Sequence, residues 1–189
     1  RELRYNWFQE LCLQHKLDYI LTAHHKEDVL ETVLLNLTRG TGLDGLTGIP
    51  EMNGNIIRPL LHFTRNDIIV FASRNKITWR EDQSNSTIKY VRNKIRHKIV
   101  PVLKELNPNL LESFDETLSH LNGSKRMVED RVLQVFKKIA VVRRNEIYFN
   151  IKKLKKLSTP KNYLYEMLHP YGFTAYSDIA RLLDAQTGK

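Results

Sequence analysis

Apolar positions in the first part of the chain alternate between helical spacing and short continuous runs. Leu3, Trp7, Phe8 and Leu11, for example, fall on one face of a helix. The apolar run at residues 19–23 is instead short enough for a buried strand. The same reasoning extends to residue 79, aided by Gly40 as a helix stop and by the capping-box pattern of Thr64 and Asp67. The pattern predicts helices over residues 1–15, 27–38 and 64–75, and strands over residues 19–23, 55–58 and 77–79.

After Thr87 the alternation stops and helical spacing dominates. A stripe at Val91, Ile95, Ile99, Val102 and Leu106 predicts one long helix, and the following Asn-Pro pair predicts its end. We expect the next helix to break at the Gly-Ser pair 123–124, because glycine weakens helices. Further helices are predicted over residues 110–121 and 128–139 and from Ser158 and Ser177, with residues 146–151 as a short strand or an extended link.

This change of pattern indicates two domains. Alternating helices and strands predict an α/β fold with a mostly parallel sheet. The change itself falls within residues 87–105. We therefore expect a partial α/β domain over residues 1–100 and a smaller, mainly helical domain over residues 101–189.

Composition and charge narrow the class of protein. The 189 residues are 41% hydrophobic, which excludes a disordered or collagen-like chain. The 30 Lys and Arg residues exceed the 21 Asp and Glu residues by 9, which favours a nucleic-acid partner over a membrane surface. Cys12 is the single cysteine, so neither an internal disulfide nor a CxxC pair forms within the chain. Without a long apolar run or a leader, we expect no membrane association and a cytoplasmic location.

A polar cluster follows the first predicted strand. His24 lies where that strand ends, and Asp28 and Glu31 lie on the polar side of the next helix. Ligands of open α/β sheets bind at the carboxyl ends of strands. Carboxylates there suit Mg²⁺ or a substrate ammonium group, and a histidine suits phosphate or the orientation of an acid. The alternative is purely structural, because acidic residues also stabilise helix N-termini.

Two further segments have anion-binding chemistry. Arg39, Gly40 and Gly42 begin a glycine-rich loop whose backbone N–H groups can approach an anion, although ordinary turns need glycine as well. Arg92 and Arg96 are four residues apart on one helical face, within an acid-free stretch that also holds Lys89 and Lys94. Two guanidinium groups so spaced can hold phosphates. There are two alternatives: the helix is basic only because it faces solvent, or the two arginines pair with Asp82 to fix the joint between the domains.

These segments together resemble one family of enzymes. The stretches AHHKEDVLETVLLNLTRGTGLDGLTGIP, IIRPLL, WREDQSN and RNKIRHKIVPVL, in this order, resemble the tRNA(Ile)-lysidine synthetases, PP-loop (N-type ATP pyrophosphatase) proteins with the older name of cell-cycle proteins. The resemblance is strong over residues 1–121. The family's AHxxDDxxET motif falls on Ala23, His24, Glu27, Asp28, Glu31 and Thr32, with Glu27 in place of the first Asp.

The resemblance implies a fold, a reaction and a set of site residues. It implies a Rossmann-like, parallel-sheet PP-loop domain followed by a helical tRNA-binding or linker domain. ATP adenylates C2 of the wobble cytidine of a minor isoleucine tRNA, and the ε-amine of L-lysine then displaces AMP. ATP and Mg²⁺ are the implied cofactors, and a homodimer is the implied assembly. The implied catalytic residues are Asp28, His24 and Glu31, with Asp28 as the Mg²⁺ ligand. Substrate or cofactor binding is implied for Glu27, Arg39, Gly40 and Gly42. Binding of tRNA is implied for Arg92, Arg96, Lys89 and Lys94.

Two departures from the family pattern leave alternatives open. The family's SGGxDS ATP loop and its C-terminal acceptor-binding domain do not occur in this sequence, so we expect an N-terminally truncated, inactive piece of the enzyme. Another PP-loop tRNA enzyme, such as a cytidine thiolase, is disfavoured because Cys12 is solitary. A non-catalytic RNA-binding module is the remaining alternative.

Overall fold

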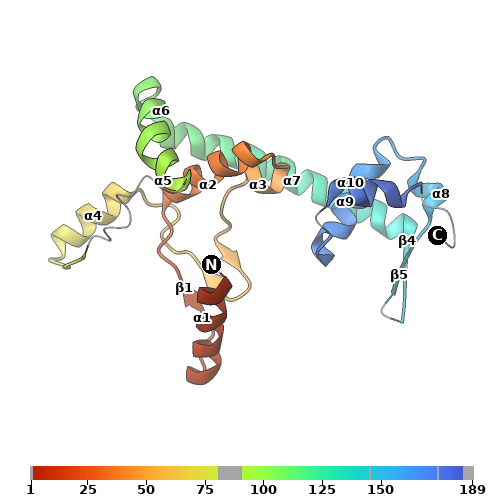
Figure 1. Ribbon diagram of the computed structural model, residues 1–189, viewed down its shortest axis with the longest axis horizontal. Helices are drawn as coiled ribbons and strands as arrows, with labels where there is room; N and C mark the ends of the chain where they lie inside the picture. The colour runs from red at the N-terminus through yellow and green to blue at the C-terminus, as the bar shows by residue number, and fades with distance from the viewer. Residues whose placement is uncertain (1, 81–90, 145, 174, 185–189) are drawn as a thin grey trace. The chain divides into compact units, whose positions relative to one another are not determined.

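The computed structural model describes residues 2–80, 91–144, 146–173 and 175–184 (Figure 1). The chain divides into two compact units, residues 1–122 and 123–189. The first unit contains α1 (Glu2–His15), β1 (Ile20–Leu21), α2 (Lys26–Arg39), α3 (Leu43–Leu46), β2 (Met52–Asn53), β3 (Ile56–Ile57), α4 (Arg65–Arg74), α5 (Val91–Lys94), the π-helical turn η2 (Ile95–Ile99), α6 (Val100–Leu106) and the first part of α7 (Leu110–Ile139).

A small sheet in the first unit has the order β1-β3-β2. β1 pairs with β3 in parallel, with Ile20 opposite Ile56, and β2 pairs with β3 in antiparallel orientation. The two strands predicted around residues 20 and 56 are confirmed in shorter form, whereas β2 was not predicted. The strand predicted over residues 77–79 is wrong, because residues 77–80 form no strand in the part of the chain that the structure describes.

The core of the first unit lies on the apolar side of α2. Val29 and Leu30 are buried there against the helical segments that follow the sheet. The same face of α2 contacts the beginning of α7, as Figure 1 also shows. Packing of the apolar side turns the polar side of α2, with its carboxylates, towards α5 and η2. The other buried members of this core are Leu61, Ile95, Val100, Leu111 and Phe114.

The π-helical turn η2 changes which residues reach this core. The N–H of Val100 donates to the carbonyl of Ile95, five residues earlier, so residues five apart lie on one face. Ile95 and Val100 are accordingly 1% and 7% exposed, whereas Ile99 is 39% exposed. Of the predicted stripe, only Ile95 is buried, because Val91, Ile99, Val102 and Leu106 are all exposed. After Ile95 the wide turn moves the buried position by one residue, from 99 to 100.

α7 is a single helix of 30 residues that runs through the division between the units. The break predicted at Gly123 is wrong, because glycine lowers helix stability only modestly and the apolar stripe continues on both sides of it. The compact units divide after Asn122, and the domain boundary expected between residues 100 and 101 stays a prediction. Among the described residues, no helix combines the length and the apolar character needed to cross a membrane.

The second unit is mainly helical and has its own core. Val135 and Ile139, at the end of α7, pack there with Leu154, Leu164 and Ile179. An antiparallel hairpin, β4–β5, follows α7 directly. The strand expected near residues 146–151 is confirmed as β5, whereas β4 and α8 were not predicted. Beyond α7, the elements of this unit are β4 (Ala140–Arg143), β5 (Glu146–Phe149), α8 (Ile151–Leu154), α9 (Pro160–Leu168), the 3₁₀ turn η3 (His169–Tyr171) and α10 (Tyr176–Leu182).

Candidate functional site

The candidate site begins at the N-terminus of α2, where the chain leaves β1. His25 is the N-cap residue of α2, and its backbone N–H donates to Oδ2 of Asp28 at 3.0 Å. The His25 ring also approaches the same oxygen, with Nε2 3.4 Å away. This local arrangement holds the Asp28 side chain against the first turn, so that its other oxygen, Oδ1, is directed to a second group of partners.

That second group is a pair of arginines, Arg92 and Arg96, from the segment that begins at residue 91. Arg96 donates from Nε to Oε1 of Glu31 at 2.6 Å and from Nη2 to Oε2 at 3.0 Å. Arg92 donates from Nε to Oε2 of Glu31 at 2.9 Å. Both arginines also place Nη2 on Oδ1 of Asp28, at 3.2 Å from Arg92 and 3.1 Å from Arg96. We call Asp28, Glu31, Arg92 and Arg96 the ion cluster.

Burial makes these contacts strong. Glu31 is 1% exposed, and the α2 carbonyl of Asp28 and the hydroxyl of Thr32 also accept from Nη2 of Arg92. The hydrogen bond to Glu31 is the main cause of the raised pKa of Arg96. Charge-assisted hydrogen bonds of this kind are shorter and stronger than neutral ones. The two carboxylates are therefore already balanced by two fixed positive charges.

Glu27 forms a separate contact beside the ion cluster. Its Oε2 accepts from Nδ1 of His25 at 3.0 Å and from the backbone N–H of Arg65, at the start of α4, at 2.9 Å. Burial alone would raise the pKa of Glu27, but these hydrogen bonds outweigh it and lower the pKa to about 2. Glu27 is consequently ionised near neutral pH, and it ties α2 to α4.

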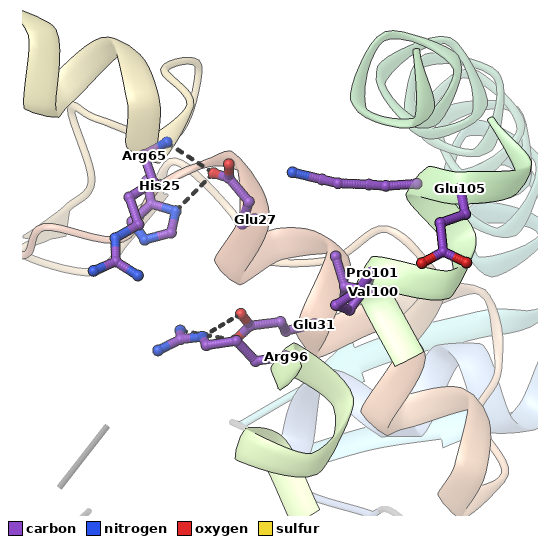
Figure 2. A pocket seen from close by; sticks show the side chains of 9 residues that line it. His25, Glu27, Glu31, Arg65, Arg96, Val100, Pro101 and Glu105 are labelled. Carbon is purple, nitrogen blue, oxygen red and sulfur yellow. Dashed lines mark hydrogen bonds and ion pairs between the residues drawn. The ribbon is translucent and has the colours of Figure 1, made fainter. Parts of the chain in front are cut away.

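An open cavity of about 490 Å³ lies over these groups (Figure 2). Figure 2 shows His25 and Arg65 meeting Glu27 on one side, and Arg96 against Glu31 on the other. The far wall comes from α6. Positive and negative side chains alternate around the cavity, which suits a ligand that carries both charges. The lining residues are His25, Glu27, Glu31, Arg65, Arg96, Val100, Pro101, Lys104 and Glu105.

A second, larger cavity of about 1080 Å³ adjoins the first and shares His25 and Arg65 with it. Its walls come mainly from α4 and from residues 77–80. Phe63 and Trp79 line it and are each about half exposed. This cavity is mostly apolar, so its chemistry differs from that of the charged cavity.

The residues of the glycine-rich loop after α2 line neither cavity. Gly40 has φ +74°, which favours glycine, but a Cβ at Gly40 or Gly42 would meet no atom within 4 Å. Gly48 is required for packing, because it has φ +80° and a Cβ there would lie 2.5 Å from Cγ1 of Val29. Arg39 is exposed at the end of α2.

The structure brings some of the predicted site residues together and separates others. Asp28, Glu31, Arg92 and Arg96 meet in the ion cluster, and Glu27 lies beside it. His24 instead shares a hydrogen bond of 2.9 Å with the hydroxyl of Thr22, and it lines neither cavity. Lys94 is exposed on α5, and Lys89, Asp82 and Asn85 lie outside the described residues.

The sequence reasoning missed His25, Arg65, Lys104 and Glu105. His25 was adjacent to the chosen histidine, and its place as the residue directly before the helix was the signal that could have identified it. The other three residues belong to no motif that indicates binding or catalysis, and only folding brings them to the cavity.

Asp28 does not fit the Mg²⁺ role expected for it in this arrangement. Its Oδ1 accepts from two guanidinium groups and its Oδ2 from the backbone of His25. Mg²⁺ needs oxygen ligands that are available to it in octahedral geometry. Among the described residues, no group of three or more His, Cys, Asp or Glu side chains is arranged to hold a metal ion.

The family profile described as the PP-loop domain matches residues 1–103, which is more than half of the chain. The chain belongs to the PP-loop family. The predicted resemblance is thereby confirmed, and the α/β class with it. A second profile, described as the TilS substrate binding domain, matches residues 142–189 of this PP-loop protein. The cavities and the ion cluster lie within the PP-loop match, apart from Lys104 and Glu105 directly after its end.

Curated relatives of this PP-loop protein are named tRNA(Ile)-lysidine synthase. The one from Porphyromonas gingivalis W83 is 39% identical over 191 residues, which cover all of this chain and 41% of that protein. The one from Bacteroides thetaiotaomicron is 38% identical over 195 residues, covering 100% of this chain and 44% of the relative. The one from Bacillus subtilis is 31% identical over 198 residues, which cover 97% of this chain and 42% of that relative. The chain spans about two fifths of the length of these relatives.

Proposed function

We propose that this PP-loop protein acts in tRNA modification as part of a tRNA(Ile)-lysidine synthase. In this reaction ATP activates C2 of the wobble cytidine of a minor isoleucine tRNA, and the ε-amine of L-lysine replaces AMP in a new carbon–nitrogen bond. The observation that carries the proposal is similarity over the whole chain to relatives of that name, with both family profiles present in one chain.

The charges of the cavity support an amino-acid substrate. Glu27 is ionised and lines the cavity, so its carboxylate is the group offered to an ammonium group. Glu105 adds a second carboxylate and Lys104 a cation on the opposite wall. We assign Glu27 to the ammonium group of lysine and Lys104 to its carboxylate. ATP, with the Mg²⁺ that accompanies it, is the second small substrate, and the glycine-rich loop at Gly40 and Gly42 remains its candidate contact.

The exposed basic residues of the second unit support a tRNA partner. They lie on the end of α7, the β4–β5 hairpin, α8 and the start of α9, and each is exposed. Lysine and arginine side chains spread over adjoining elements can follow a phosphate backbone without reading its sequence. These residues are Lys137, Lys138, Arg143, Arg144, Lys152, Lys153, Lys155, Lys156 and Lys161. A homodimer and a cytoplasmic location stay predictions.

The proposed function predicts the outcome of a chimera experiment. The stretch of the Bacillus subtilis relative that aligns with this chain is replaced by this chain, and the purified chimera receives minor isoleucine tRNA, ATP, Mg²⁺ and L-lysine. Mass spectrometry of the digested tRNA should detect lysidine. The chimera carrying Glu27→Gln should lose most of that product, and one carrying Glu112→Gln, an exposed α7 carboxylate, should not.

Two results would contradict the proposal in different ways. A folded chimera that binds ATP and tRNA but leaves the cytidine unmodified would favour the non-catalytic RNA-binding alternative. Formation of 2-thiocytidine when a sulfide donor is supplied in place of L-lysine would favour a thiolase, which the buried and solitary Cys12 of this chain does not support.

A further inference from the structure

The ion cluster gives Asp28 and Glu31 a different role from the one expected for them. Both were candidates to bind a cation, either Mg²⁺ or the ammonium group of lysine. In the structure each carboxylate already accepts hydrogen bonds from both Arg92 and Arg96. An incoming cation would have to displace two guanidinium groups from Glu31, a side chain that is almost fully buried.

We propose that Arg92 and Arg96 form a phosphate-binding pair, and that Asp28 and Glu31 are positioning residues that hold the two guanidinium groups in place. The proposal depends on the proposed function only for the source of the phosphate, which is a nucleotide or the RNA backbone.

The hydrogen-bond pattern supports this assignment. A guanidinium group is planar and carries five N–H donors. In both arginines the bonds to the carboxylates use Nε and Nη2. The residues that the structure describes form no hydrogen bond to Nη1 of either arginine. Each guanidinium is thus fixed by one edge, and within the described part of the chain its two Nη1–H donors have no acceptor, which suits a phosphate oxygen.

Exposure supports it as well. The side chains of Arg92 and Arg96 are 38% and 23% exposed, so the arginines, unlike Glu31, can be reached from solvent. Arg96 lines the charged cavity, in which Arg65 and Lys104 stand against the carboxylates of Glu27, Glu31 and Glu105. A phosphate held by Arg96 would therefore lie at the edge of the cavity in which we place the amino-acid substrate.

Fixed guanidinium groups bind an anion better than mobile ones, because the ordering cost has been met before the ligand arrives. Asp28 and Glu31 therefore strengthen phosphate binding despite their own negative charge. This leads to an unusual expectation, since removal of a nearby negative charge ordinarily strengthens the binding of an anion.

The test measures the affinity of this chain for inorganic pyrophosphate by calorimetry and follows the arginine Nε–H signals by ¹⁵N NMR. Glu31→Gln keeps the shape of the side chain but removes its charge, and should weaken pyrophosphate binding about tenfold, the value of one charge-assisted hydrogen bond. Glu112→Gln, an exposed α7 carboxylate that lines neither cavity, is the control and should leave pyrophosphate binding unchanged. The signals of Arg92 and Arg96 should move when pyrophosphate is added.

Asp28→Asn provides a second variant, because loss of the Glu31 charge also lowers stability. Parallel titrations with a single-stranded RNA heptamer identify the source of the phosphate: a larger loss for pyrophosphate indicates a nucleotide, and a larger loss for RNA indicates the backbone. Absence of pyrophosphate and RNA binding by the unmodified chain would overturn the proposal. Tighter binding by folded Glu31→Gln and Asp28→Asn, or loss of L-lysine binding alone, would overturn it too. None of these results depends on lysidine formation, so the proposed function is tested separately.

Discussion

Glu31→Gln should destabilise the first unit, and the structure sets the size of the effect. Glu31 is 1% exposed and accepts three hydrogen bonds, at 2.6, 2.9 and 3.0 Å, from two guanidinium groups. Removing one partner of a buried ion pair costs roughly 3–5 kcal/mol when the other is left buried. Arg92 and Arg96 are partly exposed, and water replaces some of their lost partners. We therefore expect a loss of about 2–3 kcal/mol in the free energy of unfolding.

Urea unfolding measures this loss. The only tryptophans, Trp7 and Trp79, lie in the first unit, so their fluorescence follows that unit and not the second. With a slope of about 2 kcal/mol per molar urea, the midpoint should fall by roughly 1 M. Glu112→Gln, at an exposed position on α7, is the matched control and should change the free energy of unfolding by less than about 0.5 kcal/mol.

A double-mutant cycle decides whether the ion cluster is the cause. In a background with Arg92→Met and Arg96→Met, Glu31→Gln has no guanidinium partner left to lose. Its cost should then fall below about 1 kcal/mol. An equal cost in both backgrounds would refute the reasoning, because the destabilisation would then come from the change of side chain and not from the lost ion pairs.

Three further predictions concern single residues. The pKa of Glu27 is lowered from 4.5 to about 2, so its contribution to stability is complete above about pH 4.5 and is lost as the pH falls towards 2. In urea unfolding at a series of pH values, the difference in unfolding free energy between wild type and Glu27→Gln should disappear over that window. Gly123→Ala, within α7 and with no atom within 4 Å of the new Cβ, should raise the thermal midpoint by the equivalent of about 0.5–1 kcal/mol, whereas the strained Gly48→Ala should lower it. Gly42→Ala should leave the melting temperature unchanged, because a Cβ there would meet no atom within 4 Å. Weaker ATP binding by the chimera that carries this substitution would identify a backbone contact with the nucleotide. Unchanged ATP binding would give Gly42 a role in the loop alone.

Local signals were sufficient for the helices whose ends are chemically marked. α4 begins where Thr64 and Asp67 form the predicted capping box, with the Asp67 N–H donating to Oγ1 of Thr64 at 3.1 Å. α2 likewise follows its apolar stripe and ends before Gly40. In both cases the residues that determine the element are neighbours in the sequence, so spacing alone was informative.

Predictions that depended on distant partners were less successful. A strand needs another strand beside it, and the alternation at residues 77–79 carries no information about whether one is present. β2 was missed for the converse reason, because its pairing with β3 and not its composition makes it a strand. Gly123 was given too much weight, since packing on both sides of it outweighs about 1 kcal/mol of intrinsic cost.

The chemistry of the site was predicted in its parts but not in its connections. Sequence spacing selected Asp28, Glu31, Arg92 and Arg96 as functional candidates, but it assigned the acids and the bases to different ligands. Their contacts join positions more than 60 residues apart, which no local pattern encodes. Of the two adjacent histidines the sequence reasoning chose His24, although the position directly before the helix favoured His25, whose ring lines the cavity.

The wide turn at Ile95–Ile99 amounts to one extra residue within an otherwise α-helical segment. Residues five apart share a face in this turn, whereas residues four apart share a face in an α-helix. Deletion of one residue of the turn, such as His97, would therefore leave Ile95 and Val100 on the same face with ordinary α-helical spacing. Proteins that share this site can accordingly differ by one residue between the second arginine and the buried valine, provided that an ordinary turn replaces the wide one.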